Sequence, residues 1–181
     1  LLWGCTTINE PDDNTFYDIV NSNFLHFTDT IAYKTGSFFL VPGDSIVSSI
    51  SGGQKINVLI DTVIHDSELL ATSIVTSLKK NNLSAFESLI SGNKQNMLQA
   101  LDVKKINQTG RYNLEPSGTV EKVDSSYAGQ IIISRPYMAT DKAIFFITIK
   151  ASVKSGKTNA YFLSEKNNNW EVLNKLEVER W

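Results

Sequence analysis

The strongest pattern in the chain is an alternation of apolar and polar positions near its end. In residues 143–153 every odd-numbered position is apolar, while the even-numbered positions become polar from Thr148 onward. A repeat of two residues is typical of a β-strand that places one face on a core and turns the other toward water. Residues 143–153 are therefore predicted to form a strand.

Short turn signals on both sides of this segment predict further strands. Pro136 closes the apolar run before it, because proline cannot donate a hydrogen bond to a central ladder. Lys154–Lys157 and Asn167–Asn169 have the composition of tight turns, in which glycine and asparagine accept a left-handed backbone. Residues 129–181 are thus expected to form an antiparallel β-meander. Its predicted strands are residues 130–134, 143–153, 159–164 and 170–181.

In the first half of the chain, apolar residues recur every three or four positions, as in a helix with one buried face. The first such stripe comprises Phe16, Val20, Phe24, Phe27 and Ile31. We expect this helix to pack on the sheet. Further helices are predicted over residues 66–80 and 84–90, with another helical turn or two within residues 93–105.

Two apolar runs of the first half, residues 38–41 and 56–64, are predicted to be strands. Residues 106–126 are polar and rich in turn-forming residues, with short strands expected near Tyr112 and Val120. Together the elements predict an α+β fold. In it, helices from the first half pack on one face of a mostly antiparallel C-terminal sheet.

The first residues resemble the end of a bacterial lipoprotein signal peptide. Leu2 lies three positions before Cys5 and the small Gly4 lies one before it, although Trp3 departs from the usual pattern. On this reading residues 1–14 are a signal remnant and polar tether, Cys5 carries a lipid anchor, and residues 15–181 form a single α+β domain. The alternative is that Cys5 is a small buried residue near a terminal strand.

Composition and charge exclude several classes of partner. The 181 residues are 41% hydrophobic and 20% charged, within the range of globular domains. The net charge of −2 gives no overall basic field for nucleic acid or anionic lipid. No apolar run is long enough for a transmembrane helix. We therefore expect neither nucleic-acid binding nor a transmembrane span.

Two short motifs suggest catalytic chemistry without meeting its requirements. Ser155–Thr158 ends like a nucleotide-binding P-loop, but that loop needs a glycine where this chain has Ala151. His65–Ser67 contains the residue types of a hydrolase triad, yet a triad is assembled from separated segments. The consecutive residues are better explained as a helix start beside an exposed histidine. No catalytic residue is predicted.

Metal and cofactor sites are not predicted either. The only histidines are His26 and His65, and the only cysteine is Cys5, so no cluster of zinc ligands can be built. Asp61 and His65 alone would make a weak site, and both are expected to be solvated. No cofactor is expected.

The aromatic residues of the meander are the remaining candidates for binding. Tyr137, Tyr161, Trp170 and Trp181 could line a groove or fill the core. Trp170 lies opposite the charged positions of its strand and is expected in the core. Trp181 lies with the charged positions and is predicted to be an exposed contact, with Tyr137 as a second surface contact.

Residues 133–137, 141–145, 160–166 and 169–172 together resemble a group of small uncharacterised envelope proteins and lipoproteins common in Bacteroidetes. The resemblance covers Gly129–Trp181. This chain departs from the group because residues 152–157 lack the cysteine pair that many members carry. The resemblance implies a location in the cell envelope, as an outer-membrane lipoprotein or in the periplasm, and a fold class. It implies no activity.

Two functions follow as hypotheses. The first is a non-enzymatic envelope protein, lipid-anchored through Cys5, that acts through contacts with an envelope protein partner. The second is a small-ligand-binding or hydrolytic pocket, because the ending is also similar to cone-shaped α+β domains like nuclear transport factor two. In such domains a curved sheet wraps a long N-terminal helix, and the fold hosts both enzymes and binding proteins.

Overall fold

A computed structural model describes residues 13–28, 56–96, 98–110, 112–119, 127–152 and 154–181. Its elements in chain order are α1 (Asp13–Phe27), β1 (Ile56–Ile60), α3 (Glu68–Lys80), the 3₁₀ helix η1 (Ser84–Phe86), α4 (Glu87–Ser91), η2 (Val103–Lys105), β2 (Tyr112–Pro116), η3 (Ser117–Thr119), β3 (Gln130–Ile133), β4 (Tyr137–Met138), β5 (Lys142–Ser152), β6 (Ser155–Lys166) and β7 (Asn169–Arg180). The predictions for the tether, Cys5, Ile31, residues 38–41 and Val120 lie outside the described residues.

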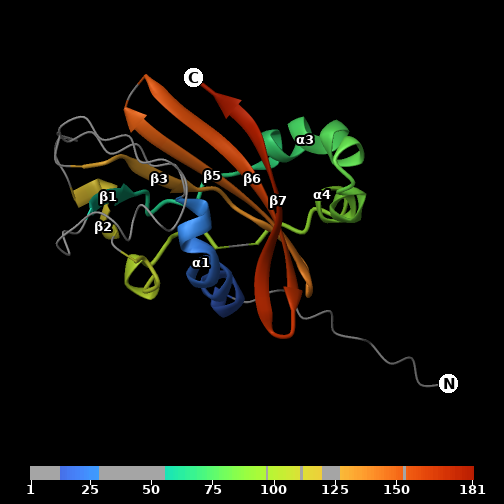
Figure 1. Ribbon diagram of the computed structural model, residues 1–181, viewed down its shortest axis with the longest axis horizontal. Helices are drawn as coiled ribbons and strands as arrows, with labels where there is room; N and C mark the ends of the chain where they lie inside the picture. The colour runs from blue at the N-terminus through green and yellow to red at the C-terminus, as the bar shows by residue number, and fades with distance from the viewer. Residues whose placement is uncertain (1–12, 29–55, 97, 111, 120–126, 153) are drawn as a thin grey trace.

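The fold class is confirmed as α+β with a mostly antiparallel sheet (Figure 1). The strand order is β2-β1-β3-β5-β6-β7, and the short β4 also pairs with β5. Strands β3, β5, β6 and β7 form the predicted antiparallel meander. Strand β1 differs from the expectation, because it pairs in parallel with both β2 and β3. One end of the sheet is therefore parallel.

Helix α1 covers one face of the sheet, as predicted from its aromatic stripe. Phe27 stacks on Phe145 of β5 with ring centroids 5.6 Å apart, and meets Tyr161 of β6 edge-on at 4.9 Å. Phe16 lies 5.6 Å from the same Phe145 ring. Trp170, expected in the core, is buried in this cluster. The helix begins at Asp13, three residues before the first residue of the stripe, Phe16.

The opposite face is also covered, which corrects the expectation that the helices pack on one face only. Helices α3 and α4 with η1 bury a second cluster that includes Ile144, Phe146 and Phe162. Phe86 of η1 meets the Phe162 ring edge-on at 5.2 Å. Strand β5 is consequently buried on both faces between Ala143 and Ile149. The sheet is the middle layer of three (Figure 1).

The segment between α4 and β2 is less helical than predicted. Within residues 93–105 the only described helix is the single turn η2. The backbone of residues 94–96 instead joins the chain around β4: Met138 N donates to the Lys94 carbonyl at 2.7 Å, and Asn96 N donates to the Pro136 carbonyl at 2.8 Å. These bonds satisfy polar backbone groups that a helix would have paired internally.

Strand β7 forms an edge of the described sheet. Its exposed positions carry mostly charged side chains, including Glu171, Lys175 and Glu177, and its pairing with β6 has two irregularities. Charges and bulges are the usual means of keeping an edge strand from pairing with another chain. Leu173 is the apolar exception, with 57% of its surface exposed.

Neighbouring buried polar residues on β6 give a first prediction. The Thr158 hydroxyl bonds to that of Thr148 at 2.8 Å, whereas the amide nitrogen of Asn159 is buried with no hydrogen-bond partner among the described residues. Replacing Asn159 by valine should raise the free energy of unfolding by about 1 kcal/mol, because an unsatisfied buried donor is removed. Urea denaturation measures this change.

Thr158→Val is the matched control, because it also places valine on β6 next to the first site. It leaves the buried Thr148 hydroxyl without its partner, so it should lower the free energy of unfolding by about 1–3 kcal/mol. Equal effects of the two substitutions would show that hydrogen bonding does not distinguish these positions.

Candidate functional site

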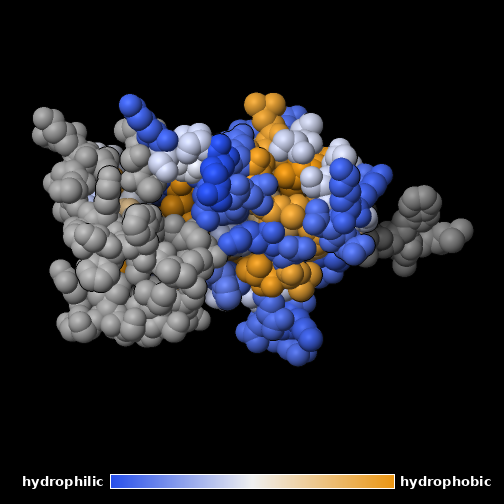
Figure 2. All heavy atoms as spheres, turned by 45° about the horizontal axis from the view of Figure 1, so that its top comes forward, coloured by the Kyte–Doolittle hydropathy of each residue, from blue (hydrophilic) through white to orange (hydrophobic). Residues whose placement is uncertain are grey.

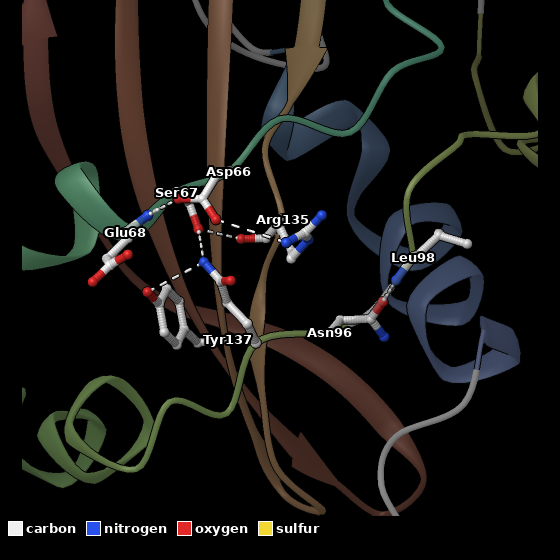
Figure 3. A network of polar contacts seen from close by, with 8 residues as sticks. Asp66, Ser67, Glu68, Asn96, Leu98, Arg135 and Tyr137 are labelled. Carbon is white, nitrogen blue, oxygen red and sulfur yellow. Dashed lines mark hydrogen bonds and ion pairs between the residues drawn. The ribbon is translucent and has the colours of Figure 1, made fainter.

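A polar cluster lies where α3 begins, beside the carboxyl ends of the parallel strands β1 and β3 (Figure 3). It consists of Asp66, Ser67, Gln95, Arg135 and Tyr137, from three segments that are distant in the sequence. The carboxyl ends of parallel strands are a common place for ligand sites in open sheets. The cluster is therefore a candidate functional site.

Hydrogen bonds inside the cluster join its three segments. The Ser67 hydroxyl donates to the Arg135 carbonyl oxygen, and the Gln95 amide nitrogen donates to Ser67 Oγ at 3.1 Å and to the Tyr137 hydroxyl at 3.3 Å. Arg135 N also donates to the His65 carbonyl at 2.7 Å. Because Ser67 and Tyr137 are buried, these bonds hold the start of α3 against the chain around β4.

The charged members of the cluster are only loosely paired. Arg135 Nη1 lies 3.7 Å from Asp66 Oδ2, beyond hydrogen-bonding distance. The other Asp66 oxygen accepts a bond from Glu68 N at 2.8 Å, which caps the first turn of α3. Burial raises the pKa of the Tyr137 hydroxyl above its ordinary value, and the negative charges of Asp66 and Glu68 raise it further. The tyrosine is thus a neutral hydrogen-bonding group and not an activated one.

The raised pKa of Tyr137 makes stability depend on alkaline pH. The unfolded chain loses the tyrosine proton near its ordinary pKa of about 10, before the folded protein does. This stabilising contribution is therefore complete below about pH 10 and is lost as pH rises through the folded pKa. In Tyr137→Phe the free energy of unfolding, measured in urea between pH 9 and 11, should fall less steeply with pH.

Tyr17 still titrates in that variant, because burial raises its pKa too. Some alkaline destabilisation should therefore remain in Tyr137→Phe. At neutral pH the substitution should lower the free energy of unfolding by about 0.5–1.5 kcal/mol, since the bond from Gln95 is lost. If the free energy of unfolding of Tyr137→Phe depended on pH as in the original protein, a raised pKa of Tyr137 would be contradicted.

The structure corrects the prediction of Tyr137 as a surface contact, because its side chain is only 2% exposed. Its hydroxyl faces Gln95 and Ser67, and its ring belongs to the second core cluster. The sequence contained no signal for Gln95, whose role depends on residues 94–96 running beside β4. Cys5, the predicted lipidation site, lies outside the described residues.

His65, from the motif His65–Ser67, makes an ordinary contact at the surface. His65 Nε2 lies 3.2 Å from Asp61 Oδ2 on the surface, and Asp61 Oδ1 accepts a bond from Val63 N. Within the described ranges, no group of three or more His, Cys, Asp or Glu side chains is arranged to hold a metal. Ser155–Thr158, which resembled the end of a P-loop, lies within β6. That segment has no helix after it, as a phosphate loop requires.

Trp181 is exposed, as predicted, and its position is well defined. Its main chain exchanges two hydrogen bonds with Gly156 at the start of β6. A Cβ atom on Gly156 would lie 2.6 Å from Cζ2 of the indole, so the ring occupies the space that a side chain would need. With 46% of its surface exposed, Trp181 offers a fixed aromatic surface to solvent.

A methyl group at Gly156 should therefore displace the Trp181 ring. In Gly156→Ala the new Cβ forces the Trp181 ring from its place, and the free energy of unfolding should fall by about 1 kcal/mol, the low end for crowding, because the exposed ring can move. The indole N–H resonance of Trp181 should shift while that of Trp170 stays. Gly118→Ala is the control, because no atom lies within 4 Å of a Cβ there, and it should be neutral or slightly stabilising. Similar losses at both glycines would contradict the crowding.

Trp181 lies in a row of residues that crosses the sheet. The pairing register places Gln130 of β3 opposite Lys150 of β5, and Lys150 opposite Gly156, on which Trp181 rests. Residues opposite one another in a sheet share a face. Gln130 and Lys150 are both half-buried, and neither side chain has a hydrogen bond or ion pair among the described residues.

Helices of the described part of the chain are too short or too polar to cross a bilayer. Comparison of the chain with protein-family models, with curated proteins and with solved structures found no match.

Proposed function

We propose that this protein is a non-enzymatic component of the bacterial cell envelope, anchored by lipid at Cys5, that acts by binding another envelope protein. The observation that supports this most is the exposed Trp181, whose ring is fixed against Gly156 by main-chain bonds. Exposed aromatic residues with little freedom are typical of protein interfaces. The lipobox-like residues Leu2, Gly4 and Cys5 support the location.

The polar cluster supports a structural role rather than a catalytic one. Its hydroxyl and amide groups bond to one another, and the Ser67 hydroxyl also bonds to the Arg135 backbone carbonyl. Catalysis would need a nucleophile and a base aimed at a space for substrate, whereas Ser67 and Tyr137 are directed inward at their partners (Figure 3).

The pocket alternative receives less support. Its basis was the similarity of the chain's ending to cone-shaped α+β domains, in which the long N-terminal helix, here α1 with its aromatic stripe, would border a pocket. Phe16, Phe24 and Phe27 are at most 1% exposed, and Phe16 and Phe27 pack directly on sheet aromatics. Rings in such contacts stabilise the core, so this stripe is explained by packing.

Intact-mass measurement of the protein from its native cell tests the anchor. We expect the mature chain to begin at Cys5 with acyl chains attached, and an unmodified Cys5 would overturn the anchor. Amine-reactive crosslinking of intact cells then tests for a partner. A specific crosslinked protein is expected, and its absence would overturn the proposed function.

A further inference from the structure

Positive charge gathers at the end of the sheet where Trp181 lies, although the whole chain is slightly acidic with a net charge of −2. Lys150 shares the face of Trp181, Lys154 is in the turn, and Lys157 and Arg180 pair with each other on the other face. The basic end is defined as Trp181 with the basic residues of the β5–β6 hairpin and the end of β7. These basic residues are Lys150, Lys154, Lys157 and Arg180. Figure 2, in which the top of Figure 1 comes forward, shows hydrophilic and hydrophobic side chains mixed over this face of the molecule.

The acidic residues at the same end cancel only part of this charge. Glu177 is paired with Arg180, and Glu179 lies opposite Thr158. The hydrogen bond from Arg180, together with the charges of Lys157 and Lys175, holds the pKa of Glu177 below its ordinary value. Glu177 therefore stays ionised and offsets one basic charge. The four basic residues of this end stand against two carboxylates, Glu177 and Glu179, and this leaves a local excess of positive charge.

Trp181 and Lys150 are next to each other on one face of the sheet. Lys150 is directly opposite Gly156, whose Cα is beneath the indole ring, and neighbouring strands are about 4.8 Å apart. An aromatic surface beside a lysine amine suits a partner that carries an apolar side chain next to a carboxylate. Complementary charge at the rim of such a contact guides association, while the buried ring contributes most of the affinity.

We propose that the basic end binds an acidic segment of another protein, with an apolar side chain of that segment packed on the Trp181 ring. This inference rests on the proposed function and names the chemistry of its partner. An anionic lipid surface is the competing occupant. It fits less well, because the Trp181 ring is held against Gly156, whereas tryptophans of membrane interfaces place their ring among the lipid headgroups.

Zero-length carbodiimide crosslinking of intact cells tests the contact directly, because this reagent joins lysine amines only to carboxylates that touch them. We expect peptides in which Lys150 or Lys154 is joined to an aspartate or glutamate of another protein. Lys79 and Lys80, exposed on α3, should give no such links. Links only at these control lysines, links between two copies of this chain, or no links would overturn the inference.

Trp181→Ala is the informative variant, since it keeps every lysine available to the reagent. The yield of links at Lys150 and Lys154 should fall about tenfold or more, as for an interface residue that dominates binding. Leu69→Ala is the matched control, because it removes an apolar side chain that is 87% exposed on α3. In this variant the yield of links at Lys150 and Lys154 should be unchanged. The charge reversal Lys154→Glu should likewise reduce links at Lys150, which gives a second test if Trp181→Ala proves unstable.

Sedimentation with vesicles separates the two occupants. The purified protein without its anchor should not bind vesicles of phosphatidylcholine with phosphatidylglycerol, and Trp181-dependent binding to them would overturn the inference in favour of a membrane. A partner found by amine-reactive crosslinking but joined elsewhere would overturn this inference alone. The absence of any partner in both experiments would overturn the proposed function as well.

Discussion

Replacing Phe145 by alanine is expected to lower the free energy of unfolding by about 3–5 kcal/mol. The ring is fully buried and contacts both Phe16 and Phe27, so its removal leaves a cavity between α1 and the sheet. Loss of this amount is a large part of the stability of a typical domain. Urea denaturation followed by circular dichroism measures the change.

Leu173→Ala is the control for this prediction. It also removes apolar side-chain atoms from a strand of the sheet, but from a position that is largely exposed, and its effect should be within about 0.5 kcal/mol. The variant Phe27→Ala/Phe145→Ala should be less destabilised than the sum of its single substitutions, because the two rings share one contact. A small effect of Phe145→Ala would mean that α1 does not pack on β5 in solution.

Phe162→Ala should have an effect of similar size, about 3–5 kcal/mol, for a reason on the other face of the sheet. Its ring is fully buried beneath Phe86 of η1 and belongs to the cluster under α3 and α4. If helices covered only the α1 face, Phe162 would be exposed and the substitution nearly neutral. Comparison of the two alanine variants therefore tests whether the sheet is the middle of three layers.

The expected result for Phe162 also has a matched control in Val63→Ala. Val63 is an apolar residue that is 55% exposed, so its truncation should change the free energy of unfolding by less than about 0.5 kcal/mol. Hydrogen exchange adds a second readout, because loss of the Phe162 ring should weaken protection in α3 and α4 more than in α1. Equal loss of protection in all three helices would contradict the separation into two clusters.

The meander was predictable from sequence because everything that specifies it is local. Its strands follow one another along the chain, apart from the two-residue β4 between β3 and β5. Asn167 and Asn168 at the β6–β7 turn have positive φ angles of 53° and 61°, as the asparagine run indicated. The turn before β6 is shorter than expected, so that Ser155 and Gly156 already belong to the strand. Local signals give the existence of such elements more reliably than their ends.

The parallel pairing was not predictable, because it joins segments that have no local relation. Ile56 pairs with Tyr112 and Leu59 pairs with Gln130, and an apolar run alone does not state which strand it will meet. The second helical layer could have been predicted from the sequence. Ile144 and Phe146 are apolar at the positions that a one-faced strand would leave polar, which is the pattern of a strand buried on both sides.

The two predicted surface contacts, Trp181 and Tyr137, also differ in whether local sequence signals could place them. Trp181 could be placed from its strand, because β7 is long enough for its alternating charges to indicate the exposed positions. Tyr137 belongs to the two-residue strand β4, which is too short for any alternation to reveal its face. Its ring is buried in the cluster under α3 and α4 and its hydroxyl accepts a bond from Gln95, so that its surroundings come from segments that only the folded chain brings together.

The parallel end of the sheet also has a consequence for the rate of folding. The hairpins of β5, β6 and β7 close short loops, whereas pairing β1 with β2 and β3 first requires the ordering of a long intervening chain. Folding slows as contacts become more distant in sequence, because loop entropy is lost before the contact is gained. The meander can therefore form early and serve as the template on which β1 adds last. Until then the edge of β3 is open, and this is the stage at which the chain is most exposed to aggregation.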